Sequence, residues 1–287
     1  MIIDLHTHSN NSDGSLSVKK IIEIAKLRNI SMLSITDHDS IFCQELASSI
    51  ANKNGIRYIT GVELNITLTH SQTHSQKPIY LDFLGYNFDS DNSQLQNKLQ
   101  QMAKYRHKRT EKILKKLNTE FRKEQIKELT KDDLDKIQYS VESVFGRPHI
   151  ADYLVRTGIV KNRNEAFDKY LVKCNVPKYP LFLEDASKLL RNAGGKIMLA
   201  HPNDPHGTSL LTLTKILDKQ TEIITDSFLQ FIDGIECWHS RNDVKTTNHY
   251  VNYAKEHGLM MTGGSDCHQK PIIMGTVNVP AFVAKQF

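Results

Sequence analysis

The sequence lacks the features that mark membrane and secreted proteins. No apolar run approaches the ~20 residues that a membrane-spanning helix needs, and the opening residues MIIDLHTHS do not have the layout of a signal peptide. The four cysteines are scattered without a CxxC pair, which argues against both a disulfide framework and a thiolate zinc site. We therefore expect a cytoplasmic protein that does not enter a membrane.

A large excess of one charge is also absent, because 37 basic and 32 acidic residues leave a net charge of +5. The 287 residues are 39% hydrophobic and 24% charged, which is typical of a globular protein with a full core. One stretch, KYRHKRTEKILKKL at 104–117, is strongly basic. It is either the solvated face of a helix or a surface that attracts phosphates or nucleic acid.

Strand-like and helix-like patterns alternate in the first and last thirds of the chain. Between them, residues 93–190 show helical periodicity without a strand signal, which predicts a helical insertion. The alternation predicts an α/β fold with a mostly parallel sheet, formed first by residues 1–92 and then by residues 191–287. The expected strands are 1–6, 31–36, 56–66, 79–87, 196–202, 231–240 and 259–266.

Histidines and carboxylates follow the ends of these expected strands. The carboxyl ends of parallel strands meet at one edge of a sheet, where α/β proteins build their active sites. Core packing is a poor explanation for so many of them, because buried ionisable groups are costly unless they pair or bind an ion. The residues at these positions are His6, His8, Asp37, His38, Glu63, His201, Asp266 and His268.

Their types and spacing point to metal binding. His6 and His8 are two apart on a strand and share a face, so either both ligate one metal ion or one of them is a packed histidine. Asp13 either adds an oxygen ligand or only shapes its Ser-Asp-Gly turn. Glu63 is placed to bridge two ions, which such sites hold ~3.5–4 Å apart. Imidazoles and carboxylates suit Mn²⁺, Fe²⁺ or Zn²⁺.

Taken together, the motifs HTH with SDG, TDHD, GVELN, LAHP and GSDCH resemble the polymerase and histidinol phosphatase (PHP) domain family, from residue 2 to about residue 275. The resemblance implies a distorted (β/α)₇ barrel with two or three divalent metal ions, Mn²⁺ being the first expectation, and hydrolysis of phosphate esters by water that the metals activate. It places catalysis on His6, His8, Glu63, Asp266 and His268. It assigns one metal to His6, His8, Glu63 and Asp266, a second to Glu63 and His201, and a third to Asp13, His38 and His268.

One position departs from the family pattern. In LDFLGY, Asp82 stands where members commonly carry a histidine. Aspartate can ligate the same metals, so either Asp82 completes the second site or that site is weakened.

The insertion resembles one branch of the family. LQQMAKYRHKRTEKI, GRPHIADYLV, NEAFDKYL and NAGGKIMLAHP are similar to proteins that dephosphorylate nucleoside 3′,5′-bisphosphates or trim the 5′ ends of short RNA. The resemblance implies that the insertion caps the barrel and binds substrate phosphates through Arg106, Arg109, Arg147 and His149. The expected partner is a small phosphorylated nucleotide or short RNA, without an obligate protein partner.

Two alternatives remain at this point. One is a phosphatase for a small metabolite of the histidinol phosphate type, and the other is a non-catalytic module that binds phosphate or nucleic acid. The remaining histidines are expected in loops or on helix surfaces, including His70, His74 and His206. His239 follows an apolar strand but has no evident partner in the sequence.

Overall fold

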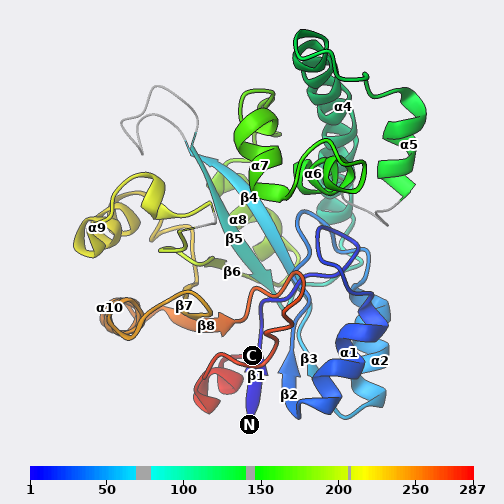
Figure 1. Cartoon of the computed structure of the whole chain (residues 1–287). Helices are drawn as coiled ribbons and strands as arrows, with labels where there is room; N and C mark the ends of the chain where they lie inside the picture. The colour runs from blue at the N-terminus through cyan, green and yellow to red at the C-terminus, as the bar shows by residue number, and fades with distance from the viewer. Residues whose placement is uncertain (69–78, 140–145, 206–207) are drawn as a thin grey trace.

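The computed structural model describes residues 1–68, 79–139, 146–205 and 208–287. His70, His74 and His206 lie outside these residues. The described strands form two sheets, the first of which is parallel and runs in the order β1 (Ile2–Asp4), β2 (Ile30–Leu33) and β3 (Arg57–Tyr58). The second, also in chain order, contains β4 (Gly61–Leu68), β5 (Ile79–Tyr86), β6 (Lys196–Leu199), β7 (Gly234–His239) and β8 (Met260–Gly264) (Figure 1). The chain is therefore a mixed α/β protein, as predicted.

One strand runs against the expected direction. β5 pairs antiparallel with β4 and with β6, whereas the other pairs in both sheets are parallel. β4 and β5 are long and adjacent in the chain, and a short connection between neighbouring strands forces them to run antiparallel. The alternating sequence pattern does not encode this reversal.

Helices pack on both sheets and form their cores. α1 (Val18–Leu27) and α2 (Gln44–Lys53) pack against β2, while α8 (Leu183–Asn192), α9 (Leu217–Ser227) and α10 (Val244–Glu256) pack against the second sheet. α1 shows how the sequence sets this arrangement. The Ser17 hydroxyl accepts a hydrogen bond from the Lys20 backbone N–H and caps the helix. The buried residues of α1 recur at helical spacing on one face, namely Val18, Ile21, Ile22 and Ala25.

The long helix α4 (Ser93–Lys123) belongs to two hydrophobic cores. Leu95, Leu99 and Met102 near its start pack in the core of the second sheet. From Ile113 onward its buried side chains pack in a separate core with the helical segment that follows. That segment contains α5 (Lys131–Tyr139), α6 (Arg147–Arg156), α7 (Arg163–Ala166) and a π-helical turn (Phe167–Leu171), gathered around the far end of α4 at the top of Figure 1.

Backbone contacts join the two sheets near the candidate ligands. Isolated parallel bridges link Thr7 with Cys267 and His38 with Glu63. The chain after β1 also passes close to the end of β8: a Cβ atom on Gly264 would lie 2.4 Å from the His6 backbone nitrogen. Only glycine permits this approach, so Gly264 brings the residues after β8 beside those after β1.

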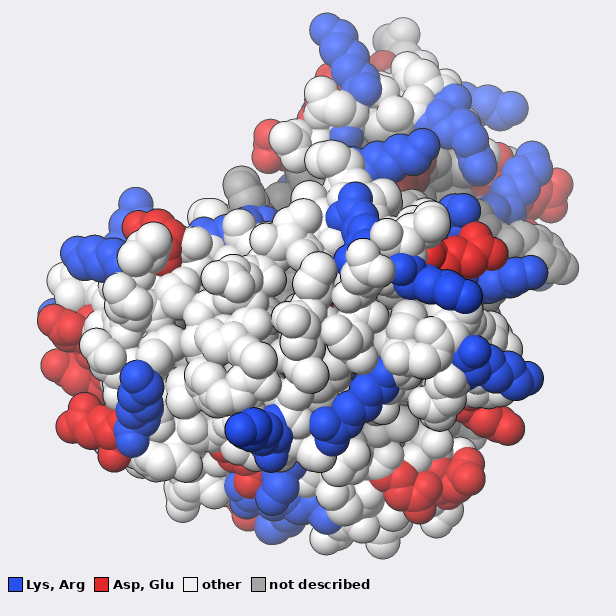
Figure 2. Space-filling view, turned by 90° about the horizontal axis from the view of Figure 1, so that it is seen from below, with Lys and Arg blue, Asp and Glu red and all other residues white. Residues whose placement is uncertain are grey.

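The remaining chain completes the surface. Short 3₁₀ helices lie at Leu210–Thr212 and Ala281–Gln286. On the face that contains the N-terminus, Lys and Arg side chains are spread singly over a largely uncharged surface with acidic side chains among them (Figure 2). In the part of the chain that the structure describes, no helix combines the length and the apolar character that crossing a bilayer requires.

Candidate metal centre

The residues after β1 and β8 converge with Glu63 of β4 in one buried cluster. His6 Nε2 lies 3.5 Å from Glu63 Oε2 and 3.3 Å from Asp266 Oδ1. His8 Nε2 lies 3.2 Å and 3.3 Å from the same two oxygens. His6, His8 and Asp266 therefore form one group that could hold a metal ion, and His6 belongs with Glu63 and His201 to another.

Glu63 also connects this cluster to the residue that follows β6. His201 Nε2 lies 3.0 Å from Glu63 Oε1, and the oxygen opposite, Oε2, faces His6 and His8. Each carboxylate oxygen of Glu63 thus faces a different set of imidazoles. This is the geometry expected of a carboxylate that bridges two ions.

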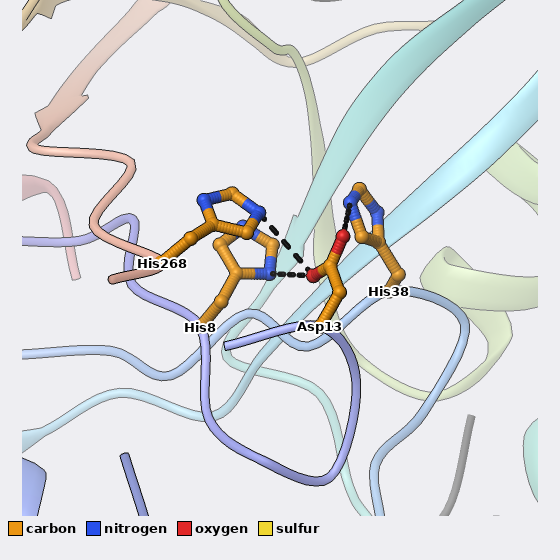
Figure 3. Close-up of side chains that lie close together, drawn as sticks. All are labelled: His8, Asp13, His38 and His268. Atoms are coloured by element: carbon orange, nitrogen blue, oxygen red, sulfur yellow. Dashed lines mark ion pairs between the residues drawn. The ribbon is translucent and has the colours of Figure 1, made fainter. Parts of the chain in front are cut away.

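A second cluster surrounds Asp13, as Figure 3 shows. Asp13 Oδ1 lies 3.3 Å from His268 Nε2 and 3.8 Å from His8 Nδ1, while Oδ2 lies 3.6 Å from His38 Nε2. The rings of His8 and His268 stack with centroids 3.9 Å apart. The structure therefore brings Asp13, His8, His38 and His268 together as one group of potential metal ligands.

Two of the candidate metal ligands have strained backbones. His201 and Asp266 have φ values of 24° and 54°, in the left-handed region that side chains other than glycine rarely adopt. Each is the second residue after a strand, where the turn of the chain directs its side chain toward the cluster. Strain of this kind typically costs about 1–3 kcal/mol per residue and concentrates at functional sites.

The loop that carries Asp13 is held by Asp37. The Asp37 carboxylate accepts hydrogen bonds from the Ser9 backbone N–H at 2.8 Å, the Ser9 hydroxyl at 2.6 Å and the Ser12 hydroxyl at 2.6 Å. Asp37 is fully buried. Its pairing explains why a buried carboxylate is tolerated here, since every contact satisfies part of its charge.

The carboxylates of the two clusters are held ionised. Burial by itself raises the pKa of Glu63, but the charges of His38 and His6 hold that pKa well below its ordinary value. Burial is likewise outweighed at Asp13, where the charges of His268 and His38 hold the pKa well below its ordinary value. Ionised carboxylate oxygens therefore face the positions where a cation would bind.

The imidazoles respond in the opposite direction. Burial lowers the pKa of His8, yet its carboxylate neighbours Asp266 and Glu63 raise it to about 10. At His201, Glu63 outweighs burial and raises the pKa to about 9. Protons therefore balance the carboxylates when metal is absent, and a metal ion that binds here must displace them.

Several buried nitrogens at this site make no hydrogen bond within the described residues. They are His6 Nε2, both ring nitrogens of His8, and His201 Nδ1. Buried polar atoms are normally satisfied, and such exceptions call for an ion or ligand. The residues present therefore fit the metal ions that the sequence predicted.

Asp82 lies at the edge of this arrangement. Its two carboxylate oxygens accept hydrogen bonds from the Asn65 amide and the Thr208 hydroxyl. It is not a member of the metal-ligand groups found among the described residues. Burial and the charge of Glu63 raise the pKa of Asp82.

A pocket of about 290 Å³ opens above the clusters, and the four residues expected to bind substrate line it. Arg106 pairs with Asp39, its Nε lying 2.9 Å from Oδ2. Arg109 is buried, and its guanidinium donates to the Val176 carbonyl and to Asn175 Oδ1, both at 2.7 Å. These contacts fix both arginines in position on the wall of the pocket.

Arg147 and His149 join the pocket from the start of α6. Arg147 donates to the Leu171 carbonyl at 3.4 Å. His149 Nδ1 accepts from the Gly146 backbone N–H at 3.0 Å, and Nε2 lies 2.9 Å from the Ser12 carbonyl, to which it donates. His149 therefore ties α6 to the loop that carries Asp13, so contact with a phosphate would require one of these bonds to break.

The sequence pattern missed several residues of the site. His239 Nε2 lies 3.5 Å from Oδ2 of Asp266, which is a candidate metal ligand. Arg241 also reaches Asp266 at 3.2 Å and lines the pocket. Lys178 lies on the same wall, where burial lowers its pKa to about 8. The sequence signals were the position of His239 after an apolar strand and, for Glu236, which contacts His6, an isolated acid in the run GIECWHS.

An α/β fold that gathers imidazoles and carboxylates in buried clusters, beneath a pocket whose wall carries arginine and lysine side chains, is typical of a metal-dependent hydrolase that acts on anionic substrates. The PHP domain profile matches residues 4–174, and the chain belongs to the PHP domain family. It is thus a metal-dependent phosphoesterase.

Characterised relatives match nearly the whole chain. A 5′-3′ exoribonuclease of Haemophilus influenzae is 28% identical over 272 residues, which cover 92% of this chain and 89% of that protein. A 3′,5′-nucleoside bisphosphate phosphatase of Chromobacterium violaceum is also 28% identical, with 93% and 87% covered.

Solved structures share the fold. One from Bifidobacterium adolescentis, assigned as a metal-dependent phosphoesterase, superposes with a TM-score of 0.79 at 25% identity, covering 99% of this chain and 94% of that one. An amidohydrolase from Chromobacterium violaceum, with bound sulfate and no metal, gives a TM-score of 0.78 at 25% identity, covering 99% and 93%.

Proposed function

We propose that this phosphoesterase hydrolyses the 3′-phosphate of a nucleoside 3′,5′-bisphosphate, a phosphate monoester of a nucleotide, or that it acts at the 5′ ends of short RNA. The observation that carries the proposal is the composition of the pocket. Its floor holds the ligand clusters, and Arg106, Arg109, Arg147 and Lys178 line its wall. A substrate with two phosphates could place one phosphate at the clusters on the floor and the other at the cations of the wall. The two relatives are named for RNA and for a nucleoside bisphosphate.

The assignment of metal ligands follows the family resemblance, and the distances between side chains support it. His6, His8, Glu63 and Asp266 hold one ion, Glu63 and His201 a second, and Asp13, His38 and His268 a third. Asp82 contributes to the second ion only if it releases Asn65 or Thr208. The bound ions, Mn²⁺ by expectation and Fe²⁺ or Zn²⁺ as alternatives, supply an activated water molecule and neutralise phosphate charge.

The protein's own residues position the substrate. Guanidinium groups grip phosphate oxygens in bidentate fashion, and Arg109 is held by its bonds to Val176 and Asn175 before substrate arrives. Lys178 adds a compact positive charge to the same wall. These cations bind the phosphate that is not cleaved, so the scissile phosphate is directed toward the clusters. A histidinol phosphate type of substrate would leave this wall without a second anion.

We further infer how the fold supports this arrangement. The two sheets are parts of one distorted barrel, supported by the bridges Thr7–Cys267 and His38–Glu63. Residues 93–190 form the insertion that caps it, supported by the separate core that runs from Ile113 to Val176, while both ends of this range pack on the second sheet. We place the enzyme in the cytoplasm, since its substrates are intracellular nucleotides.

The test is Mn²⁺-dependent phosphate release from a nucleoside 3′,5′-bisphosphate, a nucleoside 5′-monophosphate, histidinol phosphate and a 5′-phosphorylated short RNA. Preference for the bisphosphate or the RNA, abolished by a chelator and by Asp266→Asn, is the expected result. Activity confined to the simple monoesters would overturn the substrate assignment. Inactivity on all four compounds would support the non-catalytic binding module instead.

A further inference from the structure

Glu236 lies within β7, on the strand beside the one that leads to Asp266. It is fully buried, and its two carboxylate oxygens reach two different candidate ligands. Oε1 lies 3.0 Å from His6 Nδ1, and Oε2 accepts a hydrogen bond from the His201 backbone N–H at 2.8 Å. One carboxylate thus contacts residues assigned to both ions that Glu63 bridges.

The contact with His6 decides which ring nitrogen is available to a metal. A carboxylate only accepts hydrogen bonds, so His6 Nδ1 must carry the proton that faces Glu236. In the neutral ring, Nε2 then holds the lone pair, and Nε2 is the atom that faces Glu63 and Asp266 at 3.5 and 3.3 Å. Such carboxylate–imidazole contacts orient metal ligands and increase their basicity.

The contact with His201 acts on the backbone. His201 has a φ of 24°, a conformation that its surroundings must hold in place. The hydrogen bond from its backbone N–H to Glu236 is one such restraint. It holds the backbone from which the His201 side chain extends, and Nε2 of that side chain lies 3.0 Å from Glu63. Loss of this bond would free the peptide to relax and move the imidazole.

A purely structural role for Glu236 is a poor fit to its surroundings. A buried carboxylate is costly unless its bonds offset the loss of hydration. A glutamine of the same shape would accept from only one of the two groups and would direct its NH₂ at the other donor. The chemistry at this position therefore requires an acceptor at both atoms, which aspartate is too short to place and glutamine cannot provide.

We propose that Glu236 is a positioning residue that sets the ring orientation of His6 and the backbone of His201, and so the affinity of the two ions that share Glu63. The inference rests on the proposed metal site. It extends that site to a residue that contacts neither the ions nor the substrate.

The test measures Mn²⁺ affinity by equilibrium dialysis and the spin-coupled Mn²⁺ signal by electron paramagnetic resonance, in wild type and Glu236→Gln. Losing the support of a metal ligand typically weakens affinity by about 10–100-fold, so we expect a loss in that range together with loss of the coupled signal. Cys237→Ala is the matched control, because Cys237 is the buried neighbour on β7 and packs in the core instead of against the ligands. It should bind Mn²⁺ as wild type does.

A measurement on the wild-type protein removes the dependence on a variant that folds. Two-dimensional ¹H–¹⁵N spectra of the histidine rings, recorded with Zn²⁺, should show the His6 Nδ1 proton retained and the Nε2 resonance shifted by the ion. The opposite tautomer, or equal Mn²⁺ binding by wild type and Glu236→Gln, overturns the role of Glu236 alone. A wild-type protein that neither binds Mn²⁺ nor hydrolyses phosphate esters overturns both this inference and the proposed function.

Discussion

Replacing Asp37 should show how strongly the loop that carries Asp13 is anchored. Asp37→Ala removes three hydrogen bonds of 2.6–2.8 Å to Ser9 and Ser12 at a fully buried site. Each bond to a charged group contributes about 1.5–3 kcal/mol. Removing the carboxylate also removes the cost of burying its charge, which offsets part of this contribution. We therefore expect a loss of about 4 kcal/mol in the free energy of unfolding.

The assays are urea denaturation and thermal unfolding, both with a chelator present so that bound metal does not contribute. For a chain of about this size, 1 kcal/mol corresponds to a shift of about 2–4 °C in Tm, so the thermal assay should show a fall in Tm of about 8–16 °C. Asp37→Asn should lose less, because the amide oxygen can still accept from the Ser9 backbone and the Ser9 hydroxyl can reverse its donor role. If Asp37→Ala unfolds with the same urea midpoint as the wild type, the anchoring argument is refuted.

The remaining predictions concern charge and ligands. Because His8 and His201 have pKa values raised to about 10 and about 9, above the ordinary 6.5, the stability they give the metal-free protein is fully present below about pH 6.5. That stability is lost as the pH rises through 9 and 10, so the urea midpoint in chelator should fall over this range; a midpoint that rises would contradict the assignment. Mn²⁺ binding at neutral pH should release protons, visible in calorimetry as a heat that changes with the ionisation enthalpy of the buffer. Arg109→Met should raise KM for the nucleoside bisphosphate by more than it raises KM for the monophosphate, and equal effects on both would remove Arg109 from recognition of the second phosphate. Asp82→Asn should leave Mn²⁺ affinity unchanged, because its oxygens already bond Asn65 and Thr208, whereas lost affinity would make Asp82 a ligand.

The sequence alone predicted which side chains come together. His6, His8 and His201 lie shortly after strands, and strand ends can be recognised from hydrophobic runs. Glu63 was expected at the end of a strand but lies near the start of β4. The mixed α/β fold follows from the same alternation. That these residues bind metal stays a prediction; the structure shows that their side chains lie together.

Other features depend on contacts that no local pattern encodes. The reversal of β5 arises from pairing with β4 and β6, which the apolar run itself does not specify. Glu236 is a single acid inside an apolar strand. It contacts His6 and His201, which lie shortly after two other strands, and these contacts cannot be read from its own segment. The engagement of His149 with Ser12 joins residues far apart in the chain, so the sequence could indicate a phosphate contact but not this bond.

The membership of α4 in two cores has a consequence for how the chain can change length. Arg106 and Arg109 lie between Met102, which packs in one core, and Ile113, which packs in the other. Since an α-helix has 3.6 residues per turn, one inserted residue in this interval would rotate everything beyond it by about 100°. Such an insertion would separate the arginines from the pocket or the later side chains from their core. We expect length variation among homologues to be confined to the connections between helices, with this interval kept at a fixed number of residues.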